Sequence, residues 1–211
     1  DSILKNIQPL YADLMSGGFA CAHNGNLTNA SALREKLVSR GSIFQSTSDT
    51  ETILQLVAQS ERKQIVDKLI DALFQIHGAY SLVILTNKKL IGVRDPYGIR
   101  PLVLGDLNGA PVLASETCAL DIIGAKFVRE IENGEIIIIS EKGMESIRPF
   151  PKVAERPCIF ERIYFSRPDS MLGGNTVYSY RKNLGIELAK EHQVDVDIVV
   201  PVPVSYTHLT L

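Results

Sequence analysis

One short polar run carries residue types that could stabilise a carbonyl oxygen under nucleophilic attack. It reads His-Asn-Gly-Asn at residues 23–26, and it follows a short predicted strand, Phe19–Ala22. We expect the run to form a turn before a helix. There the side-chain amide of Asn24 and a backbone N–H beside Gly25 could point the same way, as in an oxyanion hole. Taken alone, the Asn-Gly pair favours an ordinary turn over an oxyanion hole.

A second run, Thr-Ser-Asp-Thr-Glu at residues 47–51, has the pattern of a helix start. Ser48 is followed three residues later by Glu51, which predicts a capping box and a helix after it. Asp49 stands at the same helix start. A capping position would fix the rotamer of its side chain, so capping and ligand binding are both open to it.

Helices are predicted first along the chain, and strands after them. Residues 1–18 lack periodicity and read as loop. A helix is expected from Thr28 or Asn29 to about Arg40, a second after Ser48, and a third, strongly amphipathic one over Ile65–Phe74. The β-rich runs that follow are Tyr80–Leu85, Lys89–Val93, Leu102–Gly105, Val112–Ala114 and Glu135–Ser140. This order predicts an α+β layered domain over residues 1–149.

The remainder of the chain reads as the start of a second domain. Residues 150–175 contain prolines and charges and are interpreted as a crossover between domains. A helix with Tyr180, Leu184 and Leu188 on one face and a strand over Val196–Val200 are then expected. Residues 176–203 are therefore interpreted as the opening of an α/β domain.

Composition excludes several classes of function. The chain has 211 residues with 22 basic and 24 acidic side chains, a net charge of −2, so it lacks the basic field that nucleic-acid binding needs. No apolar run reaches the roughly 18 residues that span a membrane. The cysteines Cys21, Cys118 and Cys158 are far apart, which fits a reducing cytoplasm better than a disulfide framework.

The two polar runs together resemble the class II, N-terminal-nucleophile glutamine amidotransferases. This resemblance implies that Asn24 and Gly25 form the oxyanion hole for the glutamine amide. It also implies that Asp49 holds the α-amino group of glutamine. A carboxylate at the entrance of a small pocket would select a free amino acid, whereas the alternative for Asp49 is a cap without a substrate role.

Longer runs narrow the resemblance to the amidophosphoribosyltransferases of purine synthesis. They are Arg94–Leu102, Ala114–Asp121 and Tyr164–Ser170, and the likeness extends from about Asn6 to Pro203. It implies a four-layer α/β/β/α sandwich followed by a phosphoribosyltransferase domain. It further implies a cytoplasmic homo-oligomer under nucleotide feedback, in which ammonia from glutamine displaces pyrophosphate from phosphoribosyl pyrophosphate to give phosphoribosylamine. Mg²⁺ would neutralise the leaving group at the phosphoribosyl site.

Several residues of these longer runs also have an expected structural role. Arg94 and Asp95 are expected to pair beside a tight turn, and Arg100 precedes Pro101, whose fixed φ would stiffen the return strand. The loop at residues 166–170 is expected to be either a polar linker or an interface between the two domains.

The resemblance places several functional groups outside these 211 residues. The nucleophilic N-terminal cysteine and the arginine for the glutamine carboxylate are expected upstream of Asp1, and the phosphoribosyl pyrophosphate loop after Val202. Cys21 cannot replace the nucleophile, because it lies in a strand without a free amine. Residues 204–211 depart from the family pattern and are expected to be a non-native tail. By itself, this stretch is expected to be inactive.

Cys158 has two interpretations. Some relatives hold a 4Fe-4S cluster with a cysteine near this position and others far downstream, outside this chain, whereas other relatives keep the cysteine without a cluster. Because a cluster takes about four thiolates and this chain has three scattered ones, a structural cysteine is favoured and Cys158 is a weak ligand candidate.

Two alternative functions remain open. One is another class II glutaminase that feeds ammonia to a sugar phosphate, although the run Tyr164–Ser170 favours the phosphoribosyl type. The other is a non-catalytic binding module with the glutaminase fold. An upstream N-terminal cysteine would distinguish an enzyme from a binding module.

Overall fold

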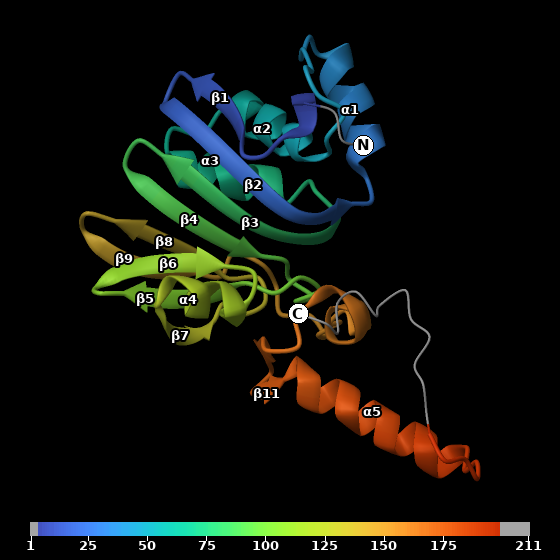
Figure 1. Ribbon diagram of the computed structural model, residues 1–211. Helices are drawn as coiled ribbons and strands as arrows, with labels where there is room; N and C mark the ends of the chain where they lie inside the picture. The colour runs from blue at the N-terminus through green and yellow to red at the C-terminus, as the bar shows by residue number, and fades with distance from the viewer. Residues whose placement is uncertain (1–3, 199–211) are drawn as a thin grey trace.

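A six-stranded antiparallel sheet forms the centre of the structure, a computed structural model that describes residues 4–198 (Figure 1). Its strands lie in the order β1-β2-β3-β4-β8-β9. Their bounds are Leu10–Leu14, Gly17–Leu27, Gly78–Thr86, Lys89–Arg94, Ile136–Ser140 and Gly143–Ile147. The longest strand, β2, pairs with β3 along nine residues, so it is a rigid base for the polar run at 23–26.

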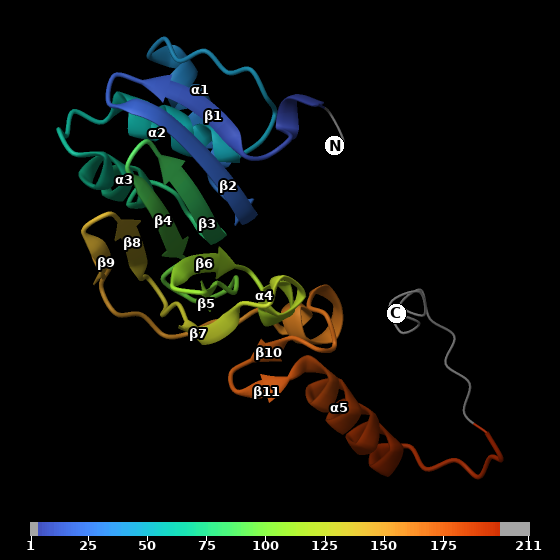
Figure 2. The same cartoon turned by 60° about the vertical axis from the view of Figure 1, so that its left-hand side comes forward.

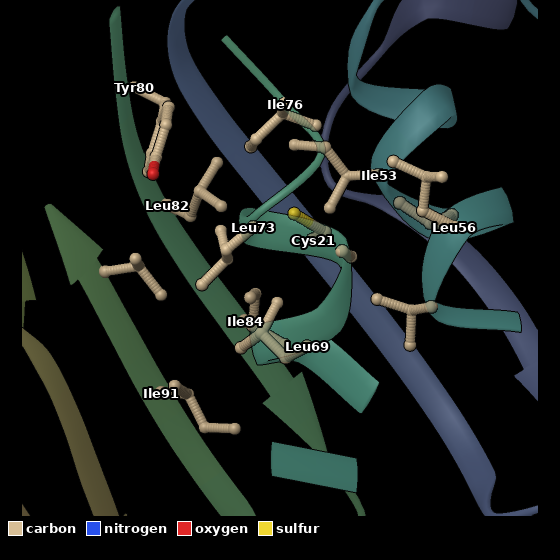
Figure 3. Packing of buried hydrophobic residues seen from close by; sticks show 14 of the residues in the cluster. Cys21, Ile53, Leu56, Leu69, Leu73, Ile76, Tyr80, Leu82, Ile84 and Ile91 are labelled. Atoms are coloured by element: carbon tan, nitrogen blue, oxygen red, sulfur yellow. The ribbon is translucent and has the colours of Figure 1, made fainter. Parts of the chain in front are cut away.

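Three helices cover one face of this sheet. They are α1 (Ala30–Ser39), α2 (Thr50–Gln59) and α3 (Ile65–Leu73). The buried side of α3 presents residues at helical spacing, including Leu69 and Leu73, to the sheet. Figure 3 shows these leucines against Cys21 of β2 and Leu82 and Ile84 of β3. This is the main hydrophobic core.

A smaller sheet covers the opposite face. It consists of β5 (Val103–Leu107), β6 (Ala110–Ala114) and β7 (Lys126–Glu130), in the order β6-β5-β7, and α4 (Thr117–Ile123) packs on its outer side (Figure 2). Apolar residues of β5 and β8 fill the space between the sheets. The predicted four-layer α/β/β/α sandwich is therefore confirmed.

Several local predictions were wrong. Residues 1–18 are not simply loop, because a short 3₁₀ turn (η1, Leu4–Asn6) is followed by β1, which pairs with β2. The strands β7 and β9 and the helix α4 were not predicted. Both strands are largely exposed, so their sequences lack the alternation of buried and polar residues that marks a strand. They exist because neighbouring strands offer backbone partners.

The chain beyond the sandwich continues as a single extended arm. Residues 151–158 form no helix or strand, and η2 (Glu161–Phe165) is one π-helical turn. Two short strands, β10 (Met171–Leu172) and β11 (Asn175–Thr176), lead into α5 (Val177–Glu191), the predicted helix. Residues 196–198 lie in no strand, contrary to the predicted strand over Val196–Val200. The rest of that strand and residues 204–211 lie outside the described residues, and the domain boundaries stay predictions.

No helix within residues 4–198 is both long enough and apolar enough to cross a membrane.

Glu135 makes the stability of the sandwich depend on pH. Its side chain is fully buried and accepts hydrogen bonds from Arg129 (2.6 and 2.9 Å), from the Glu132 N–H (2.7 Å) and from the Ser146 hydroxyl. Burial alone would raise the pKa of Glu135, but these donors outweigh it and lower the pKa to about 2. A depressed folded pKa stabilises the protein above the ordinary value of about 4.5, and this stability is lost as pH falls toward 2.

We therefore expect Glu135→Gln to lower the free energy of unfolding by about 2–3 kcal/mol at pH 7. The difference from the unsubstituted protein should shrink as urea unfolding is repeated toward pH 2.5. Glu132→Gln is the matched control, because the Glu132–Arg148 pair is exposed and should contribute little at any pH. A difference of equal size at both pH values would contradict the assignment.

Candidate active site

Asn24 lies within β2 and not in the predicted turn. It pairs with Ser81 of β3, so the His-Asn-Gly-Asn run continues the sheet. The neighbouring residue His23 faces the helices and is buried. Because side chains alternate along a strand, Asn24 points to the other face, toward the smaller sheet. The long pairing with β3 outweighed the turn preference of Asn-Gly.

The amide of Asn24 is held at both ends. Its Nδ2 donates to the hydroxyl oxygen of Ser115, 3.2 Å away, and its Oδ1 accepts a hydrogen bond from Nη2 of Arg100. An amide nitrogen carries two hydrogens. The bond to Ser115 uses one of them, which leaves the second N–H of Asn24 available to a ligand. This is the chemical capacity that an oxyanion donor requires.

Gly25 is fixed by the closeness of β3. A Cβ atom at this position would lie 2.0 Å from the carbonyl oxygen of Ala79, and the backbone has φ of +152°. No other residue type fits here without moving β3. Position 25 therefore carries no side chain beside the Asn24 amide, and its backbone is exposed.

Asp49 reaches β2 from the helical side of the sheet. It occupies the N-cap position of α2, but its side chain makes no capping hydrogen bond. Instead Oδ2 accepts the backbone N–H of Leu27 at 2.9 Å, and Oδ1 lies 3.6 Å from Nδ1 of His23. Asp49 therefore anchors the helix start to the end of the strand that carries Asn24 and Gly25.

The capping box predicted for Ser48 and Glu51 is not formed. The hydroxyl of Ser48 accepts the N–H of Thr50 (3.2 Å), one residue short of the expected contact. The carboxylate of Glu51 accepts the N–H groups of Gln45 and Ser46, both at 2.7 Å, and the Ser46 hydroxyl at 2.6 Å. Glu51 thus orders the loop before α2. Its carboxylate binds donors of this loop and not the backbone N–H at the start of the helix.

His23 is a site residue for which the sequence predicted no role. Its ring is buried, with Nδ1 3.3 Å from the Thr50 hydroxyl and Nε2 3.4 Å from the carbonyl oxygen of Ala79. The side chain of Gln8 holds the backbone of His23, accepting from its N–H and donating to its oxygen (3.0 Å).

The surroundings of Asp49 keep it ionised. Burial alone would raise the pKa of this carboxyl, but the hydrogen bonds from His23 and the Leu27 N–H bring it below its ordinary value. Asp49 thus presents a negative charge at neutral pH, about one quarter exposed. A carboxylate in this state can bind an ammonium group.

Arg94 and Asp95 do not pair with each other, contrary to expectation. Asp95 is fully buried and its carboxylate caps the turn that follows. It accepts three backbone N–H groups at 3.0–3.1 Å, those of Tyr97, Ile99 and Arg100. Arg94 binds carbonyl oxygens, those of Arg100 (3.0 Å), Ile131 (2.7 Å) and Gly98 (3.4 Å). Both side chains therefore bind nearby backbone groups and not each other.

Arg100, held by that turn, is the second site residue without a predicted role. Its guanidinium donates to Asn24, lies 2.5 Å from Oε1 of Glu161 through Nη1, and stands 5.3 Å from the ring centroid of Phe165. The only signal in the sequence is its place at the end of the Arg94–Leu102 run. Its partners are 76 and 61 residues away, so local patterns do not reveal them.

The loop at residues 166–170 is docked on the sandwich. Oε2 of Glu116 accepts the Arg167 N–H (2.8 Å) and the Ser170 hydroxyl (2.7 Å), and the Thr117 hydroxyl oxygen accepts the Met171 N–H (2.8 Å). Two of the longer runs seen in the sequence thus contact each other. These contacts fix the loop against the sandwich, and its role between two domains stays a prediction.

The cysteines lie in three separate places. Cys21 is a core residue, and burial raises the pKa of its thiol to about 12, so it is not a thiolate at neutral pH. Cys118 is buried at the start of α4. Cys158 is half-buried and lines a cavity of about 720 Å³ between residues 94–101, 130–134 and 148–173. Within residues 4–198 no three His, Cys, Asp or Glu side chains gather as a metal site.

Comparison with known proteins places this geometry in a family. Residues 1–121 match a model described as a glutamine amidotransferase domain. The chain is 55% identical over 205 residues to an amidophosphoribosyltransferase of Rhizobium etli, covering 95% of this chain and 41% of that protein. It is 48% identical over 205 residues to a chloroplastic amidophosphoribosyltransferase of Arabidopsis thaliana, covering 97% and 36%.

Solved structures agree with these relatives. The glutamine phosphoribosylpyrophosphate amidotransferase of Bacillus subtilis, complexed with ADP and GMP, superposes with a TM-score of 0.90 at 44% identity, covering 93% of this chain and 44% of that one. A structure described as the allosteric regulatory enzyme of purine biosynthesis gives 0.89 at 45% identity, covering 92% and 42%. The chain spans less than half the length of each of these proteins. It belongs to the family of glutamine amidotransferase domains, and within that family it resembles the amidophosphoribosyltransferases.

Proposed function

We propose that this chain is the glutaminase part of an amidophosphoribosyltransferase. The protein would hydrolyse glutamine to glutamate and pass the ammonia to phosphoribosyl pyrophosphate, giving 5-phosphoribosylamine and pyrophosphate. The observation that carries the proposal is the amide of Asn24, which has its oxygen bound to Arg100 and one N–H left over. The ammonia acceptor, phosphoribosyl pyrophosphate, is inferred from the names of the relatives.

Each site residue has a proposed part in the reaction. As a thiolate attacks the glutamine amide, negative charge develops on the carbonyl oxygen, and the N–H of Asn24 with the backbone beside Gly25 would stabilise it. Asp49 would hold the α-amino group of glutamine before and during attack. The thiolate itself is assigned by family resemblance to an N-terminal cysteine. Cys21 does not fit that part, because it is buried and protonated.

The cofactors and the oligomeric state are proposed for the whole protein and not for this chain alone. Mg²⁺ is proposed for the phosphoribosyl site, which the glutaminase residues do not form. A 4Fe-4S cluster in the whole protein is a secondary proposal, with Cys158 as one ligand candidate. A cluster takes about four thiolates, and Cys21 and Cys118 lie elsewhere in the sandwich, so its other ligands would have to come from outside this chain. No step is assigned to a cluster. A cytoplasmic homo-oligomer that uses no nucleic acid or membrane is also part of the proposal.

The proposal is tested by the choice of ammonia acceptor. In the full-length protein with Mg²⁺, glutamate release should be accompanied by pyrophosphate release when phosphoribosyl pyrophosphate is supplied. No aminated product should form when fructose 6-phosphate replaces it. Amination of the sugar phosphate would instead identify a different class II glutaminase, and absence of glutamate release under all conditions would indicate a binding module.

A further inference from the structure

We infer that Arg100 is a positioning residue that orients the amide of Asn24, and that Glu161 holds Arg100 in place for this purpose. The inference rests on the proposed oxyanion role of Asn24. It assigns a purpose to Arg100 within the Arg94–Leu102 run.

An asparagine makes a poor oxyanion donor unless its orientation is fixed. The two ends of the amide have nearly the same shape, but one donates hydrogen bonds and the other accepts them. Rotation by half a turn about χ2 would direct a carbonyl oxygen, in place of an N–H, toward the glutamine oxygen. That arrangement would repel the developing negative charge.

Arg100 is the contact that can decide between the two orientations. A guanidinium has five N–H donors and no acceptor, so the end of Asn24 that faces it has to be the oxygen. The other neighbour, Ser115, has a hydroxyl that can donate or accept, so it tolerates either end. Orientation therefore depends on Arg100 and not on Ser115.

The structure holds Arg100 by both its backbone and its side chain. Its N–H donates to Asp95 (3.1 Å), and its carbonyl accepts from Arg94 (3.0 Å). Nη1 pairs with Glu161, and the side chains of this pair are only 17% and 7% exposed, so salt and water screen it weakly. Among the described residues, neither Nε of Arg100 nor Oε1 of Glu161 has a hydrogen-bond partner. The guanidinium is therefore fixed by the Nη1 ion pair with Glu161 and by the Nη2 hydrogen bond to Asn24.

Glu161 brings a distant part of the chain into the site. It lies in η2, after the irregular segment 151–158, and its second oxygen accepts the hydroxyl of Ser166 at 3.1 Å. Arg181 of α5 donates to the carbonyl oxygens of Arg162 and Ser166, both at 2.8 Å. The orientation of Asn24 thus depends on the docking of the arm beyond the sandwich.

The test is a double-mutant cycle in the full-length enzyme. Arg100→Gln should lower glutamine-dependent kcat by about 10–100-fold, less than the loss of the donor itself, with little change in the KM for glutamine. In an Asn24→Ala background the same substitution should cause no further loss, because no amide remains to be oriented. Ammonia-dependent synthesis should persist in every variant and reports that the protein is folded.

Companion variants separate charge from orientation. Arg100→Lys keeps the charge but has a single ammonium for two partners, so its kcat should lie between those of the unsubstituted enzyme and Arg100→Gln. Glu161→Gln should lower kcat in the same direction. Arg148→Gln is the matched control, since Arg148 also pairs with a glutamate (2.9 Å) but is about half exposed, and it should leave kcat unchanged.

The outcomes distinguish this inference from the proposed function. If Arg100→Gln lowers kcat by the same factor with and without Asn24, Arg100 acts elsewhere and the inference is wrong. If Asn24→Ala lowers glutamine use but Arg100→Gln does not, only the orienting role fails. If Asn24→Ala has no effect, the oxyanion assignment and the inference fall together.

Discussion

Replacing Asn24 with alanine in the full-length enzyme is expected to lower glutamine-dependent turnover by about 10²–10³-fold, the usual loss for one oxyanion donor. The N–H that would face the developing charge is removed, while Gly25 and the β2–β3 pairing remain. Synthesis from added ammonia should continue, because that route contains no glutamine amide. Steady-state rates with the two nitrogen sources give the comparison.

Two further substitutions sharpen this experiment. Asn24→Asp keeps the contact with Arg100 through a carboxylate but lacks the amide N–H, so it should lose as much glutamine-dependent activity as the alanine variant. Asn26→Ala removes an exposed amide two residues along the same strand and should have little effect. Equal losses with glutamine and with ammonia for Asn24→Ala would exclude the oxyanion role.

Asp49→Asn is expected to act on substrate binding. We expect the KM for glutamine to rise by about 10–100-fold, the loss of a charged hydrogen bond worth about 1.5–3 kcal/mol, because the ammonium contact is already present in the ground state. An amide oxygen can still accept the N–H of Leu27, so the anchor between α2 and β2 should survive. Initial rates over a range of glutamine concentrations would measure the change.

A substrate analogue provides the control for this second prediction. The unsubstituted enzyme should discriminate against a glutamine analogue without the α-amino group, whereas Asp49→Asn should lose most of that discrimination. If the variant instead lowers kcat with both compounds and leaves KM unchanged, Asp49 serves only the fold, through its contacts with Leu27 and His23.

Local patterns failed where a backbone partner lay far along the chain. The sequence predicted a turn at Asn24 because Asn and Gly favour turns, yet β3 pairs with this run and keeps it extended. Likewise, β1 was not predicted because its alternation of half-buried and exposed residues runs over only five positions, yet it forms along the edge that β2 offers. Pairing between strands is decided by the partner, and a single segment does not contain that information.

The amphipathic helix α3 followed from the sequence itself, through the spacing of Leu69 and Leu73. Such features depend on neighbours a few positions away. The roles of Asn24, Gly25 and Asp49 came from the family resemblance of two short runs, and they stay predictions. Only the tertiary structure joined Asn24 to Arg100 and Arg100 to Glu161, because these contacts bring together residues 76 and 61 positions apart. They depend on how the two sheets and the arm pack, which no local pattern specifies.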